Sequence, residues 1–107
     1  MTQEEIKNKC EELGQKHGCK VHPLHFKDAA SNEDVVGFIR EPERHVKLRY
    51  MDKALTGSST AGAEIVEAYL IREESDERIL KDDVFFLGAV HALNKVITLA
   101  VDQLKGN

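Results

Sequence analysis

The stretch that decides the fold is residues 82–104, DDVFFLGAVHALNKVITLAVDQL. Apolar residues recur along it at helical spacing on two neighbouring stripes. One stripe contains Phe85, Ala89, Ala92, Val96 and Leu99, and the other contains Phe86, Val90, Leu93, Ile97, Val101 and Leu104. A helix that is apolar over so wide an arc is either the central helix of a core or a helix whose outer stripe a partner covers. Asp82 or Asp83 is the expected N-cap, because a carboxylate there accepts from free backbone amides.

Three further helices are predicted upstream of this stretch. Thr2-Gln3-Glu4-Glu5 is a capping box that opens an N-terminal helix within residues 1–18. A second helix is expected over residues 42–55, with Pro42 in its first turn. Its expected apolar positions are Val46, Leu48, Met51 and Leu55. A third helix is expected to be capped by Ser59 or Thr60 and to run to about Arg72.

Residues 20–40 predict a β-hairpin. The first strand contains Pro23, which cannot donate to a ladder and therefore belongs at a sheet edge. Residues 27–34 are rich in turn-forming residues, and residues 35–40 form the clearest strand of the chain. A two-stranded hairpin is marginal on its own, so it must pack on helices or be extended by another chain. The predicted fold is α+β: one domain, residues 1–107, with a small antiparallel hairpin packed on about four helices, most of them within residues 42–105.

The length and composition fit a single small intracellular domain. A chain of 107 residues buries about 65% of its unfolded surface, which is enough for one core without metal or disulfide staples. The formal net charge of −4 disfavours nucleic acid as a partner, because such binding relies on Lys and Arg. The polar N-terminal residues and the short apolar runs predict neither a signal peptide nor a membrane span, so the expected location is the cytoplasm. Cys10 and Cys19 are expected to be free thiols.

The sequence offers no convergent reactive groups. His22 and His25 stand three apart on a predicted strand, so their side chains should point to opposite faces rather than to one metal ion. No phosphate loop, nucleophile elbow or zincin motif occurs. We therefore expect no catalytic, metal-binding or cofactor-binding residues, and we expect a protein that is not an enzyme.

The order of features resembles the small tail assembly chaperones of long-tailed bacteriophages. A strand joins a helix through a basic residue and a proline in residues 37–42, GFIREP, and Met51 and Ala54 follow before a break of small residues. An Ala-rich helix, an acidic turn through Ser75-Asp76 and a last helix beginning DDVFFL complete the pattern. The similarity covers roughly residues 20–105 and is one of layout and residue class. Many members carry a Trp-containing stretch in the third helix, where this chain has Tyr69-Leu70-Ile71.

The resemblance implies a protein that binds the long helical tape-measure protein and keeps it soluble while the tail tube polymerises, in the cytoplasm of the host cell. On this hypothesis one stripe of the last helix builds the core and part of the other takes a partner helix. The candidate partner-binding residues are Phe85, Phe86, Val90, Leu93, Ile97 and Val101. The alternative is that both stripes are buried within the fold.

A second candidate contact is the edge of the hairpin, which could add a strand from a neighbouring subunit and so build a homo-oligomer. Its residues are Val35, Val36, Phe38 and Ile39. Two other functions stay open from the sequence. One is a small phage or mobile-element protein that binds or inhibits a host protein, and the other is a head-tail connector subunit.

Overall fold

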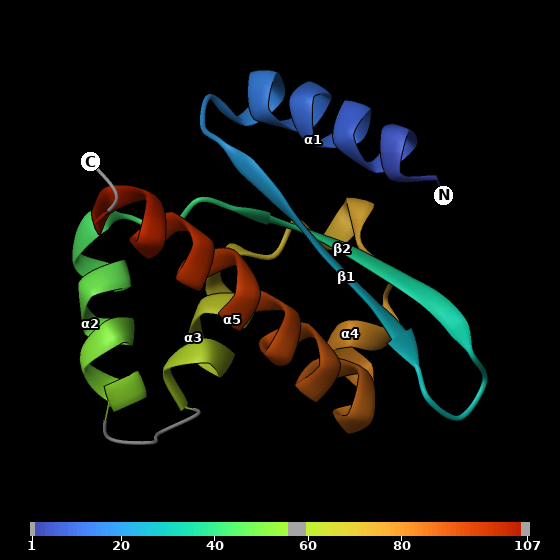
Figure 1. Ribbon diagram of the computed structural model, residues 1–107. Coiled ribbons are helices and arrows are strands. Elements are labelled where there is room, and N and C mark those ends of the chain that lie inside the picture. Colours follow the sequence, from blue (N-terminus) through green and yellow to red (C-terminus); the bar gives the residue numbers. More distant parts are fainter. Residues whose placement is uncertain (1, 56–59, 106–107) are drawn as a thin grey trace.

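The computed structural model describes residues 2–55 and 60–105, with side chains described for residues 2–52 and 61–97. The elements along the chain are α1 (Gln3–His17), β1 (Val21–Asp28), β2 (Glu33–Arg40), α2 (Arg44–Leu55), α3 (Thr60–Tyr69), a 3₁₀ turn at Arg72–Glu74, α4 (Arg78–Lys81) and α5 (Asp83–Lys105). The fold is α+β, as the sequence predicts. The hairpin lies between α1 on one face and α3, α4 and α5 on the other, while α2 packs on α3 (Figure 1).

Helix α1 is fixed at both ends by local signals. The Thr2 hydroxyl accepts from the Glu5 amide at 3.1 Å, and the Glu5 carboxylate accepts from the Thr2 amide at 3.2 Å, which confirms the capping box. Gly18 ends the helix with a φ of 68°, a left-handed conformation that favours glycine. Between these caps, Ile6 and Leu13 are buried against residues of the hairpin's outer face. Helix α1 therefore covers that face with its own small hydrophobic cluster.

Pro23 lies at a position of β1 where the lack of a backbone N–H breaks no hydrogen bond to β2. Strands β1 and β2 are antiparallel, and Pro23 lies opposite Phe38. The Phe38 backbone groups bond to residues on the side away from β1, so this pair exchanges no ladder bonds. Pro23 is consequently accommodated at the centre of β1, which fits its predicted place in an edge strand.

The main core lies between the other face of the hairpin and the helices. Leu24, Val35 and Ile39 of the hairpin meet Val66 of α3 and Leu93 of α5 there, and all five are buried. Gly37 faces the same side, and a Cβ built on it would come within 2.8 Å of the Ile79 Cδ1 atom. The glycine therefore lets Ile79 of α4 approach the strand closely.

Two helix boundaries and one additional short helix differ from the prediction. Helix α2 begins at Arg44, two residues after Pro42, which is buried. On this helix Leu48, which is expected at an apolar position, is 55% exposed, and Tyr50 is buried. Helix α3 ends at Tyr69 rather than near Arg72, because the chain after it turns to pair with β2. Helix α4 is a single turn that the sequence pattern did not predict. The pairing of Leu70 with Ile39 after α3 is a tertiary contact that local propensity does not encode.

Replacing Gly37 with alanine should destabilise the fold by about 1–3 kcal/mol, because the added methyl group overpacks the contact with Ile79. Equilibrium chemical denaturation of the Gly37→Ala variant measures this change. Ile79→Val removes the Cδ1 atom and should cost about 0.5–1.5 kcal/mol by itself. The double variant should lose less than the sum of the two. Simple additivity would show that the Gly37–Ile79 contact is not the cause.

Candidate protein-binding surface

The N-terminal end of α5 is held by a cap and by an arginine clamp. The Asp82 carboxylate accepts from the amides of Val84 at 2.9 Å and Phe85 at 3.3 Å, which identifies Asp82 as the predicted N-cap. The Arg78 guanidinium lies 4.6 Å from the centre of the Phe85 ring. It also bonds to Asp76 at 2.8 Å and to Glu33 at 2.9 Å. These contacts tie the start of α5 to α4 and to the hairpin tip.

Most residues predicted to bind a partner lie in the protein's own core. Phe85, Val90, Leu93 and Ile97 are buried, and Phe86 is half-buried against the same core. The Val101 side chain lies outside the described residues. Through Ile97, the stripe residues of α5 are buried or half-buried against the hairpin and α3, so this part of the helix completes the core. Phe85, Val90, Leu93 and Ile97 are therefore not accessible to a partner in this structure, which corrects their predicted role as contact residues.

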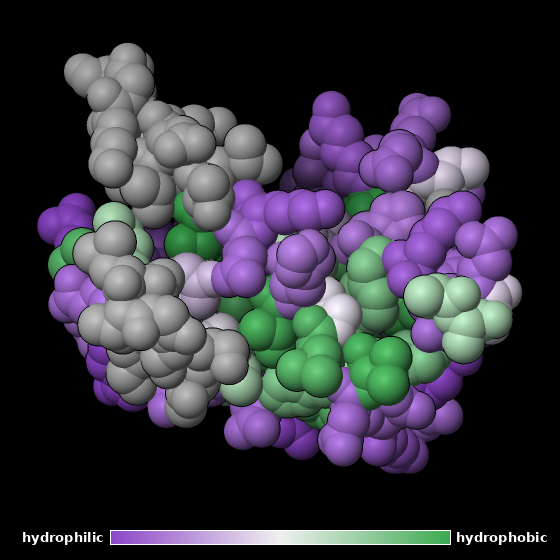
Figure 2. Space-filling view, turned by 60° about the horizontal axis from the view of Figure 1, so that its bottom comes forward, coloured by the Kyte–Doolittle hydropathy of each residue, from purple (hydrophilic) through white to green (hydrophobic). Residues whose placement is uncertain are grey.

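The exposed face of α5 carries Val84 and Leu87. Each of these side chains is 66% exposed. His91 and Asn94 continue the same face and are exposed as well. Figure 2 shows apolar surface gathered in a band on one side of the molecule, with polar surface around it. Val84 and Leu87 are three residues apart, so their side chains are neighbours on one face of the helix.

The predicted edge contact on β2 is occupied by the chain itself. The Ile71 amide donates to the Phe38 carbonyl at 2.8 Å, and the Asp76 amide donates to the Val36 carbonyl at 3.1 Å. The Ser75 hydroxyl accepts from the Phe38 amide at 2.9 Å and donates to the Ile71 carbonyl at 2.7 Å. Among the four residues predicted for strand addition, only the Val36 side chain is partly exposed, while Val35, Phe38 and Ile39 are buried. This edge is therefore closed to a strand from another chain.

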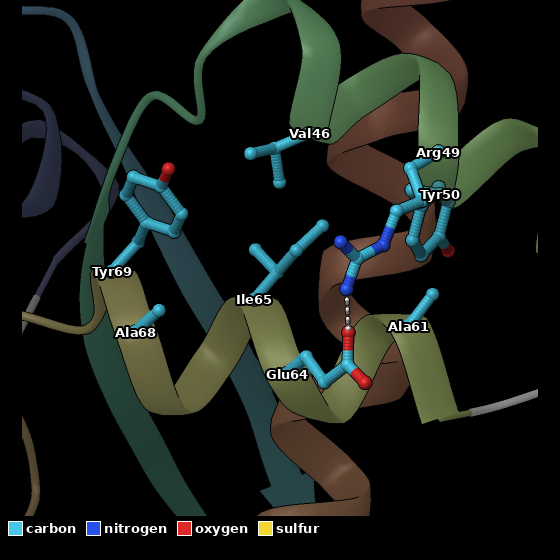
Figure 3. Close-up of a pocket in the computed structure, with 8 residues that line it drawn as sticks. All are labelled: Val46, Arg49, Tyr50, Ala61, Glu64, Ile65, Ala68 and Tyr69. Atoms are coloured by element: carbon cyan, nitrogen blue, oxygen red, sulfur yellow. Dashed lines mark hydrogen bonds and ion pairs between the residues drawn. The ribbon is translucent and has the colours of Figure 1, made fainter.

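A shallow groove of about 190 Å³ lies between α2 and α3. Its floor is apolar, and the Arg49–Glu64 ion pair crosses it at 2.9 Å (Figure 3). Its lining residues are Val46, Arg49, Tyr50, Ala61, Glu64, Ile65, Ala68 and Tyr69. The Arg40 guanidinium lies 5.4 Å from the centre of the Tyr69 ring. The groove combines an apolar floor with both signs of charge, so it favours no single class of ligand.

The histidines of β1 each have their own carboxylate neighbour. His22 lies 3.2 Å from Glu41, and His25 lies 3.3 Å from Asp34. Within the described residues, no group of three or more His, Cys, Asp or Glu side chains could hold a metal ion. Burial raises the pKa of the Cys10 thiol to about 11, which suits a packing role better than a nucleophilic one.

Comparison of the chain with protein-family models, with curated proteins and with solved structures gives no match. Among the described residues, no helix has both the length and the apolar character needed to cross a membrane. The candidate function therefore depends on the geometry of the surfaces described above. The face carried by Val84 and Leu87 escaped the sequence analysis, because it lies beside the two stripes that dominate the helical periodicity.

Replacing Ser75 with alanine should destabilise the fold by about 1–3 kcal/mol, because the Phe38 amide would lose its partner in a partly buried place. Thermal and denaturant unfolding measure this loss. Ser31→Ala is a matched control, since the Ser31 hydroxyl bonds only to Asp28 in the exposed hairpin turn. The control should change stability by less than about 0.5 kcal/mol. Equal effects of the two substitutions would contradict the role given to Ser75.

The Arg78 clamp should make stability depend on pH. Its hydrogen bonds to the Asp76 carboxylate hold the pKa of that carboxyl below its ordinary value. A carboxyl whose pKa is lowered on folding stabilises the protein above its unfolded pKa of about 3.9, and this stabilisation is lost as the pH falls through the folded value. Arg78→Met should therefore lower the free energy of unfolding at pH 7. Below about pH 4, the free energy of unfolding of the variant should fall less steeply with decreasing pH than that of the original protein. Parallel acid-unfolding curves for the two proteins would contradict the coupling.

Proposed function

We propose that the protein is a tail assembly chaperone that binds the tape-measure protein of a long-tailed bacteriophage. The single observation that carries the proposal is the exposure of Val84 and Leu87 on adjacent turns of α5, at the surface of a helix that also forms the core. A chaperone needs accessible apolar side chains on a frame that stays folded while they are exposed. Helix α5 provides this combination, because its other faces are anchored in the core.

The layout of the chain supports the same proposal. Strand β2 leads through residues 40–42 into α2, and an acidic turn with Ser75 and Asp76 precedes the capped start of α5. This order of features is the one by which the sequence resembles the tail assembly chaperones. The Ser75 and Asp76 backbone groups and side chains also fix the turn against β2 and α4. The turn therefore has a definite structural role in presenting α5.

Co-expression tests this proposal directly. The tape-measure protein encoded in the same phage genome should be largely insoluble when expressed alone, and its soluble fraction should rise several-fold when this protein is co-expressed. The two should then co-purify through a tag on either one. A small acidic protein of unrelated fold serves as the control for expression load. Unchanged insolubility of the tape-measure protein, or retention of this protein in finished tails, would contradict a chaperone role.

A further inference from the structure

We propose that the exposed face of α5 binds one helix of the client, in antiparallel orientation and with heptad register. This inference deepens the proposed function and rests on it for the identity of the client. The face consists of Val84, Leu87, His91 and Asn94, and we call it the seam. These residues are spaced three, four and three apart, and all four are exposed. This is the spacing of the a and d positions by which one helix packs along another.

The seam is apolar at one end and polar at the other. Val84 and Leu87 occupy its N-terminal half, and His91 and Asn94 occupy its C-terminal half. Polar residues at a and d positions weaken the association of helices but fix its register. A partner helix therefore has to place apolar side chains against Val84 and Leu87 and polar ones against His91 and Asn94. A partner helix with apolar residues at all of its a and d positions would not be held in a single register.

Two exposed charges flank the seam. Asp83 stands at its N-terminal end and Lys95 at its C-terminal end, and both are exposed. Neither forms an ion pair with another residue in the part of the chain whose side chains are described. Along a helix their positions differ by roughly 18 Å. A complementary partner therefore carries a cation beside Asp83 and an anion beside Lys95.

These charges also select the direction of the partner. Lys and Arg stabilise the C-terminal end of a helix, and Asp and Glu stabilise its N-terminal end. A partner that runs antiparallel to α5 brings its basic C-terminal end to Asp83 and its acidic N-terminal end to Lys95. In this orientation, the basic and acidic residues that stabilise the two ends of the partner helix are also the ones attracted by Asp83 and Lys95. A parallel partner would have to carry them at the unfavourable ends.

Two synthetic peptides of three heptads each provide the test. Both carry leucine at the apolar seam positions and polar residues opposite His91 and Asn94. The first has glutamate in its first heptad and lysine in its last, and the second has the same composition with these charges exchanged. Binding to the full-length protein is measured by fluorescence anisotropy. The first peptide should bind about five-fold more tightly than the second, as expected for two exposed ion pairs.

Charge reversal in the protein provides the complementary arm. The double variant Asp83→Lys/Lys95→Glu should reverse the preference between the two peptides. Asp82, the N-cap, is left in place so that α5 keeps its start, and circular dichroism checks that the fold is retained. An unchanged preference in this variant, or no preference in the original protein, would overturn the assigned direction.

Leu87 and Leu48 form a matched pair for the apolar contact. Both are exposed leucines on helices, but Leu48 lies on α2 and outside the seam. Leu87→Glu should weaken binding of the first peptide by about ten-fold, because a buried leucine contact is lost. Leu48→Glu should leave the affinity unchanged, and Leu87→Gln repeats the test without a new charge. Equal effects at the two leucines, or no binding of either peptide, would overturn the seam.

The same variants separate this inference from the proposed function. In co-expression with the tape-measure protein, Leu87→Glu should reduce the soluble yield and Leu48→Glu should not. If both variants protect the tape-measure protein as well as the original does, the chaperone function stands and the seam is wrong. If the original protein binds the first peptide but fails to solubilise the tape-measure protein, the seam stands and the proposed client is wrong.

Discussion

A two-stranded sheet has two faces and two edges, and each face of this hairpin carries apolar side chains that have to leave water. The fold meets this constraint with four helices and one further segment. Helix α1 covers one face, helices α3 to α5 cover the other, and residues 70–76 close the edge of β2. Fully burying one large apolar side chain stabilises a fold by about 1.5–3 kcal/mol. Leaving either face of the hairpin exposed to water would lose this stabilisation for each apolar side chain on it. The position of α5 follows from this need.

The elements that depend on short-range patterns could be predicted from the sequence. The capping box at Thr2, the edge strand that contains Pro23 and the cap at Asp82 each involve neighbours a few residues apart, and all three are present. Strand β1 continues through Pro23 without an interruption. The hairpin and the long last helix follow from periodicities of two and 3.6 residues. These signals are sufficient for the α+β class, because each depends on residues that are close together in the sequence.

The surface could not be predicted in the same way, since burial is decided by contacts between distant segments. The periodicity of α5 shows that its apolar arc is wide, but it does not show which part faces outward. The pattern also leaves Val84 and Leu87 outside both stripes, and the structure shows them exposed while Leu93 is buried. The closure of the β2 edge likewise depends on Ile71 and Asp76, more than thirty residues away along the chain. Local helix propensity predicts instead that α3 continues to about Arg72, whereas the helix ends at Tyr69.

Pro23 has a consequence for how the protein behaves when it is abundant. The structure closes one edge of the hairpin, so β1 provides the other edge of the two-stranded sheet. An open edge invites copies of a chain to add strand by strand into aggregates. On the outward side of β1, Pro23 breaks the row of amide donors that an added strand would need. Pro23 therefore lowers the tendency of copies of this chain to associate through the edge of β1.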